Sequence, residues 1–359
     1  MRSQYGIGRC EAARIPKFGP LFTDFGRSWT LRTTVEFLAQ CLPVDHSPLV
    51  QLHGFSVDQM RWCAMHTLNL GIYPVALAEG LLVLADWWVA TNLDGQMHDE
   101  DALDEGLKKM FVRFKQWTSN NKITCSLRQW KRATLHIKEC DNIVFPWMLV
   151  KAFNARVVLA WLSDELFTEK SCILAARPGE AADLAGRRQQ MASLTMGAVW
   201  SLAEWQNLCE RSPRYLSHEQ AHQMYDVGMA ALHFMLAAAT EACNQNMSRW
   251  LILPKCHLYH HMLCDQLKEL YNCRFYHNYG GEDYMGVLKV SCARNAGANM
   301  HERVLRRSLL KLVVLRPEDV AKMGQNGATR AGGHVSGSRF FRNRAWFQQI
   351  WQPGPSYQL

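Results

Sequence analysis

The chain lacks the features by which secreted and membrane proteins are usually recognised. Its twelve cysteines are scattered, with no Cys-x-x-Cys pair and no compact disulfide framework, and its first residues, MRSQYGIGRC, lack an apolar signal-peptide core. The two most apolar windows, residues 76–90 and 145–162, each contain two charged side chains that would be costly in a bilayer. These side chains are Glu79, Asp86, Lys151 and Arg156. We therefore expect a reduced intracellular protein, nuclear rather than cytoplasmic, with no membrane partner.

Several enzyme signatures and repeat patterns are absent too. No Walker loop, nucleophile elbow or dinucleotide-binding fingerprint is found. No self-similar period marks a solenoid, and alternating strand patterns are few. Because 48% of the residues are hydrophobic and 20% are charged, the composition is that of a globular protein. The sequence thus predicts a mainly α, bundle-like body.

Acidic residues are missing from the last forty positions, where five Lys and Arg residues remain. Residues 1–33 carry a net charge of about +4, so that of the total of +8 about −1 is left for residues 34–319. Basic segments of this kind contact phosphate without needing a fold. We expect them to bind nucleic acid, DNA rather than RNA, although they could equally serve only to keep the ends soluble.

Helical periodicity dominates the rest of the chain. Residues 94–117 give the clearest amphipathic helix, with acids at its start and bases toward its end. Ser217 and Gln220 fit a capping box that opens a long helix. Further helices are expected at residues 56–89, 126–138, 145–165, 180–211, 257–270 and 302–315. The predicted organisation is an irregular basic arm at 1–50, a mainly α-helical domain at 51–318 and a disordered basic tail at 319–359.

Two short strings contain residues suited to metal binding. Cys63 and His66 stand three residues apart in WCAMHTLNLGI, and His257 and His261 stand four apart in PKCHLYHH. A spacing of four places both imidazoles on one face of a helix. Together the four side chains would complete a closed, structural Zn²⁺ site. The alternatives are buried helix residues without a metal, or ligation by the near substitutes Cys256, His260 and Cys264.

These strings resemble the DDE transposases with an RNase-H-like fold, of the CACTA and Kyakuja-Dileera-Zisupton-like type. Cys63-x-x-His66 before Leu-Gly resembles their Cys/Asp-x-x-His motif, and residues 202–208, LAEWQNL, resemble a string of their helical insertion. PKCHL at residues 254–258 resembles the Pro-Lys-x-His-Leu string before their last catalytic acid. The resemblance covers roughly residues 55–290, which implies the C-terminal, insertion-bearing part of such a protein and possession of its zinc site. The strings also resemble large protist protein families of unknown activity.

The resemblance implies catalytic positions as well. Glu282 falls about twenty residues after His261, where the last acid is expected, and Asp45 stands where the second acid would be. DDE chemistry holds two divalent ions between three carboxylates, so it would need Mg²⁺ or Mn²⁺. The residues before Cys63 offer no convincing first acid and no strand pattern to carry it. Glu282 can instead cap the helix that follows it.

Three functions remain open from the sequence. The first is a transposase-derived, catalytically inactive nucleic-acid-binding protein that keeps a structural Cys/His metal site, with at most a remnant of the RNase-H-like core. The second is a helical structural or interaction protein without nucleic-acid activity. The third is an active DDE-type nuclease or transposase, completed by residues missing at the N-terminal side or by another chain.

Overall fold

The computed structural model describes residues 61–92, 99–137 and 145–279, with residues 53–56 and a few single positions beyond them. Described residues up to Tyr276 belong to one compact unit, and those from His277 belong to a second. Everything below concerns the first unit. The predicted basic arm, the basic tail and any RNase-H-like remnant lie outside the described residues.

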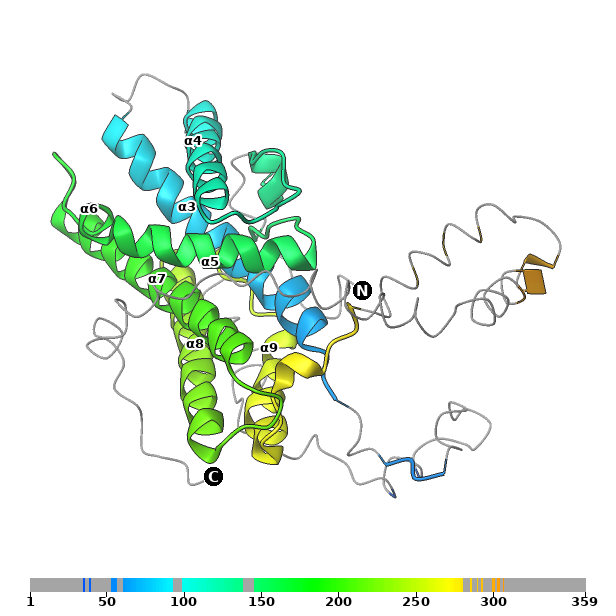
Figure 1. The fold of residues 1–359 in the computed structure, drawn as a ribbon. Helices are drawn as coiled ribbons and strands as arrows, with labels where there is room; N and C mark the ends of the chain where they lie inside the picture. The colour runs from blue at the N-terminus through cyan, green and yellow to red at the C-terminus, as the bar shows by residue number, and fades with distance from the viewer. Residues whose placement is uncertain are drawn as a thin grey trace. The chain divides into compact units, whose positions relative to one another are not determined.

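The first unit is built from helices, which confirms the mainly α fold class for the part of the chain that the structure describes (Figure 1). An isolated antiparallel bridge joins Tyr215 and Tyr271. The α-helices are α3 Tyr73–Asn92, α4 Asp99–Asn120, α5 Ala152–Thr168, α6 Lys170–Ile173, α7 Ala182–Arg211, α8 His218–Asn244 and α9 Pro254–His261. The π-helices are η6 Met65–Ile72 and η8 Met262–Gln266, and the 3₁₀ turns are η7 Arg132–Leu135, η9 Leu267–Glu269 and η10 Cys273–Phe275.

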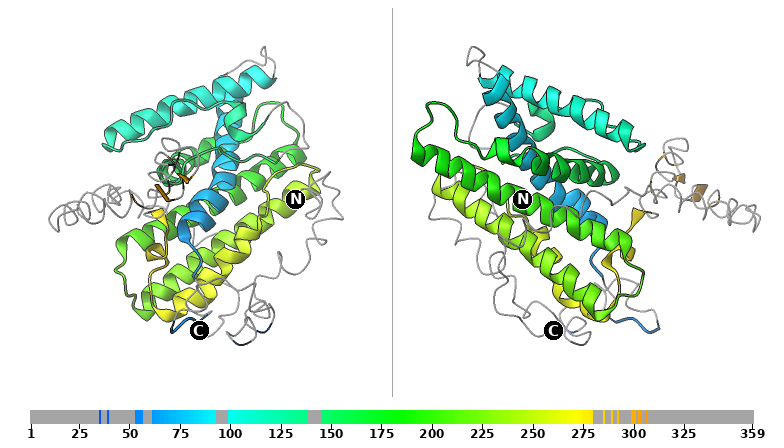
Figure 2. Two further views of the ribbon diagram at one scale, coloured as in Figure 1. Left: turned by 90° about the vertical axis from the view of Figure 1, so that its right-hand side faces the viewer. Right: turned by 60° about the vertical axis from the view of Figure 1, so that its left-hand side comes forward.

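Helices α7 and α8 form the long pair at the centre of the unit. They lie side by side along their lengths, as Figure 2 shows from two directions. Helices α3 and α5 pack against α7, and α4 packs against α3 (Figure 1). Between α4 and α5 the rings of Phe114, Trp130 and Trp161 meet, with centroids 5.1 to 5.5 Å apart. This aromatic cluster joins α4 and the segment around Trp130 to α5.

Two helix predictions that depend on local chemistry are confirmed. In α4 the expected apolar stripe is buried, with Leu107, Met110 and Phe114 fully shielded from solvent. At the start of α8 the Ser217 hydroxyl accepts the Gln220 N–H at 3.1 Å, and the Gln220 side chain accepts the Ser217 N–H at 3.0 Å. This reciprocal capping box satisfies two backbone donors that the first turn leaves free.

The helix predicted at residues 126–138 is wrong. Over residues 126–137, which the structure describes, the short turn η7 is the only helical element, and residues 126–131 have no regular secondary structure. Trp130 is buried beside Phe111 and Phe114, at ring distances of 5.3 and 5.1 Å. The Asp104 carboxylate also accepts the backbone N–H of Arg132 at 2.9 Å. Tertiary contacts to α4 therefore decide the backbone of this segment, and its local periodicity does not.

The stretch Met65–Asn92, which comprises η6 and α3, is long and apolar enough to cross a membrane by length and composition. Of its most apolar window, 83% is buried inside the protein, as in the core helix of a globular fold. Glu79 on this stretch is fully buried, pairs with Arg249 and accepts the Trp250 N–H at 2.7 Å. Burial raises the pKa of the Glu79 carboxyl, against the opposing pull of Arg249. The span thus makes its polar contacts with its own protein.

Candidate metal centre

Cys63 and His66 lie where an extended segment turns into the π-helix η6. The Cys63 sulfur is 3.2 Å from Nδ1 of His66, and both residues are half-buried. The Tyr73 N–H bonds to the Leu68 carbonyl five residues back, which is the π-helical pattern. Pro74 is the next residue and has no backbone N–H. The change from the π-helix to α3 at this point therefore leaves no further backbone N–H without an acceptor. The helix changes type here and continues.

His257 and His261 lie on one face of α9. Pro254 begins this helix, as expected of a proline in a first turn. The two Nε2 atoms are 3.0 Å apart, and the ring planes cross at 80°. His261 is only 5% exposed. The predicted spacing therefore brings the two imidazole nitrogens directly together.

Asp265 orients this histidine pair. Its carboxylate is 2.6 Å from Nδ1 of His261 and accepts the proton on that nitrogen. The two Nε2 atoms are joined by one hydrogen bond, and among the described residues Nδ1 of His257 has no hydrogen-bond partner. Burial lowers the pKa of His257, and His261 lowers it further while Asp265 opposes this. Neutral imidazoles backed by a carboxylate are the form in which histidine binds metals.

The segment that contains Cys63 and His66 packs against the segment that contains the histidine pair. The Trp62 N–H donates to the Gln266 side chain at 3.0 Å, and the Trp62 ring lies 6.5 Å from that of His261. The Ala64 N–H donates to the Tyr276 carbonyl at 2.9 Å. Residues about two hundred positions apart therefore share one corner of the unit.

Gly71 and Lys255 make a second contact between the same two segments, where the start of α9 meets η6. The Lys255 ammonium donates to the Leu70 carbonyl at 3.0 Å. A Cβ atom added to Gly71 would lie 2.3 Å from Cδ of Lys255. Glycine at this position lets the start of α9 approach the backbone of η6.

The third string of the resemblance reaches this corner from α7. Trp205, in LAEWQNL, is buried and meets the ring of Tyr259 edge-on, with centroids 5.3 Å apart. The neighbouring Gln206 accepts the hydroxyl of Tyr73, which follows directly after WCAMHTLNLGI, at 2.9 Å. Three strings that are distant in sequence thus meet around Tyr73 and Tyr259.

The four candidate zinc ligands lie in two pairs, and the distance within the histidine pair suits zinc. Two nitrogens bound to one Zn²⁺ at 2.0–2.1 Å in tetrahedral geometry lie about 3.3 Å apart, close to the 3.0 Å found for His257 and His261. The two members of each pair are hydrogen-bonded to one another. Within the described ranges, no three His, Cys, Asp or Glu side chains are gathered closely enough to hold a metal. The four-ligand site of Cys63, His66, His257 and His261 therefore stays a prediction.

The near substitutes are placed differently. His260 and Cys264 form their own pair, with Nε2 and Sγ 3.1 Å apart. Burial raises the pKa of the Cys264 thiol to about 11 and that of Cys256 to about 12. Since zinc takes the thiolate, the raised pKa makes each of these two thiols a weaker zinc ligand. The sequence interpretation missed Asp265, although its position four residues after His261 could have pointed to it.

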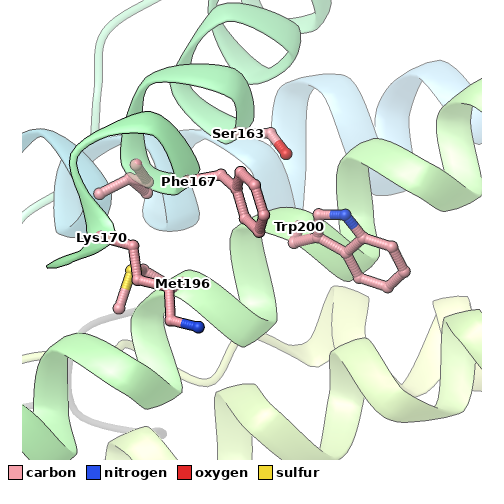
Figure 3. Close-up of a pocket in the computed structure, with 6 residues that line it drawn as sticks. Ser163, Phe167, Lys170, Met196 and Trp200 are labelled. Atoms are coloured by element: carbon pink, nitrogen blue, oxygen red, sulfur yellow. The ribbon is translucent and has the colours of Figure 1, made fainter. Parts of the chain in front are cut away.

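The catalytic positions predicted at Asp45 and Glu282 lie outside the described residues. A small pocket between α5, α6 and α7 offers no alternative site. Its volume of about 10 Å³ is room for about one water molecule. Figure 3 shows its lining, in which Lys170 and Ser163 are the polar residues beside Phe167, Met196, Trp200 and Leu166.

Comparisons with known proteins point to no function, so the functional interpretation rests mainly on the region around Cys63 and His261. No protein-family model, no curated protein and no solved structure matches this chain.

Proposed function

We propose that this chain is a transposase-derived nucleic-acid-binding protein whose helical body is held by a structural zinc ion. The observation that carries the proposal is the meeting of the three resembling strings at one corner, through the contacts of Tyr73 with Gln206, Trp205 with Tyr259, and Trp62 with His261. A resemblance of short strings gains weight when strings far apart in the chain also pack together.

Zinc would be held by Cys63 and His66 from one segment and by His257 and His261 from the other. Four protein ligands leave no open position, so the ion would be structural rather than catalytic. It would join two elements that already touch, with Asp265 orienting His261 as a carboxylate does behind a zinc-bound histidine. Binding would require the side chains of the two pairs to rotate toward one another.

Nucleic acid is the partner that the charge distribution favours. The net charge of +8 is concentrated in residues 1–33 and 320–359. Basic segments attract phosphate through counterion release, which makes affinity fall steeply with salt. We propose binding as the activity, because basic segments contact phosphate without any catalytic residue.

The zinc part is tested by metal analysis of the purified chain. We expect about one zinc per chain in the wild type and its loss in His257→Ala and His261→Ala. The matched control is His222→Ala, since His222 and Asp226 on α8 form another i,i+4 pair, at 3.5 Å, but an exposed one. Loss of zinc in the control to the same degree, or no zinc in the wild type, would refute the site.

The nucleic-acid part is tested by fluorescence anisotropy with labelled DNA and RNA over a range of salt concentrations. We expect binding whose affinity falls about tenfold or more between 50 and 200 mM salt, with DNA bound at least as well as RNA. A chain that binds neither at low salt is not a nucleic-acid-binding protein, whatever its metal content.

A further inference from the structure

A second basic surface lies within the helical body. We call residues 121–137 and 145–151 the basic segment. It contains five Lys and Arg residues and no Asp or Glu. These are Lys122, Arg128, Lys131, Arg132 and Lys151, all of them exposed except the half-buried Arg132.

The exposed cations of the basic segment are not neutralised by the helices around them. Arg132 pairs with Asp104 at 3.2 Å. The other four form no ion pair with any carboxylate that the structure describes. On neighbouring α4, by contrast, Lys108 and Lys109 both pair with Glu105. Among the described residues, these four exposed cations are therefore left available to an anionic partner.

The two stretches of the basic segment run side by side. The Leu149 N–H donates to the Thr134 carbonyl at 2.8 Å, and the Trp147 N–H donates to the Leu135 carbonyl at 3.2 Å. Farther along, the Asn154 amide, just after the second stretch, donates to the Ser126 hydroxyl at 2.9 Å. The two stretches, each with exposed cations, thus lie next to each other.

An exposed aromatic ring stands on this surface. Trp147 is 39% exposed, and its ring stacks on the imidazole of His136 with centroids 4.0 Å apart and planes 8° from parallel. His136 ends η7 with a positive φ of 57°, a conformation that histidine adopts more readily than most residues. The stacking fixes the plane of the indole while much of it remains open to solvent.

We propose that the basic segment binds single-stranded nucleic acid, with Trp147 stacking on a base and the exposed cations of the segment contacting phosphates. Single strands offer unstacked bases to aromatic side chains, whereas a duplex keeps its bases stacked inside. The inference rests on nucleic-acid binding as proposed above, and it places a contact in the helical body in addition to the ends of the chain.

The test uses the full chain, labelled single-stranded and duplex DNA of the same length, and vesicles with anionic lipid. We expect tighter binding to the single strand, and a loss of about five- to a hundredfold in Trp147→Ala. Trp147→Phe keeps an aromatic face and should remain within a few-fold of the wild type. The pair Arg128→Ala with Lys131→Ala should weaken binding and flatten its salt dependence.

The matched control for charge is Lys108→Ala with Lys109→Ala, which removes two cations from α4 outside the basic segment. It should bind as the wild type does, and thermal unfolding of every variant shows whether its fold is retained. Binding that is unaffected by Trp147→Ala and by loss of Arg128 and Lys131 overturns this inference but leaves nucleic-acid binding standing. Equal affinity for the duplex, or vesicle binding in place of DNA binding, also overturns it. No binding to any nucleic acid overturns the proposed function itself.

Discussion

Glu79 and Asp86 stand two turns apart on α3 and form ion pairs in opposite surroundings. Glu79 is fully buried, pairs with Arg249 and accepts the Trp250 N–H, whereas Asp86 is 57% exposed and pairs with Arg177. Removing one partner of a buried pair leaves a charge without compensation in a medium of low polarity. An exposed pair is replaced by water at little cost.

We therefore predict that Glu79→Ala lowers the free energy of unfolding by about 3–5 kcal/mol. Asp86→Ala, the control on the same helix, should change it by less than about 1 kcal/mol. Urea unfolding followed by circular dichroism measures both. Equal losses in the two variants would show that Glu79 does not anchor α3 to the segment after α8.

Glu180 gives stability a dependence on pH. Both oxygens accept from Arg188 at 2.8 Å, and Arg188 also donates to the Ile173 and Ala175 carbonyls. The hydrogen bonds from Arg188 lower the pKa of Glu180 from 4.5 to about 2. Because the folded state holds the carboxylate in its charged form, this contribution is complete above the unfolded value and is lost as pH falls from 4.5 toward 2.

The prediction is that Glu180→Gln destabilises the protein at pH 7 and that the difference from wild type shrinks as the pH is lowered to 3. Denaturant midpoints at pH 7, 4 and 3 give the comparison. If the difference in stability between Glu180→Gln and the wild type is the same at every pH, the hydrogen-bonded pair of Glu180 and Arg188 does not cause the pH dependence.

At the level of elements, Gly228 sets how closely α8 approaches α9 and η8. An added Cβ would lie 2.3 Å from a methyl of Leu263 and 2.9 Å from the Tyr259 hydroxyl, and both residues are fully buried. We predict that Gly228→Ala costs about 1–3 kcal/mol despite the better helix propensity of alanine. Gly186 in α7 has open space around it, so Gly186→Ala should stabilise by about 0.5–1 kcal/mol. Calorimetry that finds both variants stabilised would remove Gly228 from the α8–α9 contact.

The helices that the sequence predicts correctly are those whose ends and buried faces are determined by their own residues. The capping box of Ser217 and Gln220, the proline that begins α9 and the apolar stripe of α4 are local signals, and each is confirmed. The segment around Trp130 was mistaken for a helix because its backbone is held by α4, a contact that no local pattern reports.

At the candidate site too, some features could be predicted from the local sequence and others could not. The spacing of His257 and His261 predicted their shared face, and the structure places their nitrogens together. The meeting of the two strings was expected from their complementary Cys and His residues, because nothing in the local pattern of either string specifies a partner two hundred residues away. The helix expected at residues 257–270 already placed Asp265 four residues after His261, so this contact could have been predicted from spacing and was missed.

For the whole molecule, we propose that one zinc ion joins the two distant strings and holds a nucleic-acid-binding body together. X-ray absorption at the zinc edge of the purified full chain tests this most directly. The predicted spectrum has one sulfur at about 2.3 Å and three nitrogens at about 2.0–2.1 Å, from Cys63, His66, His257 and His261. A chain without stoichiometric zinc, or zinc surrounded only by oxygen and nitrogen, would contradict it.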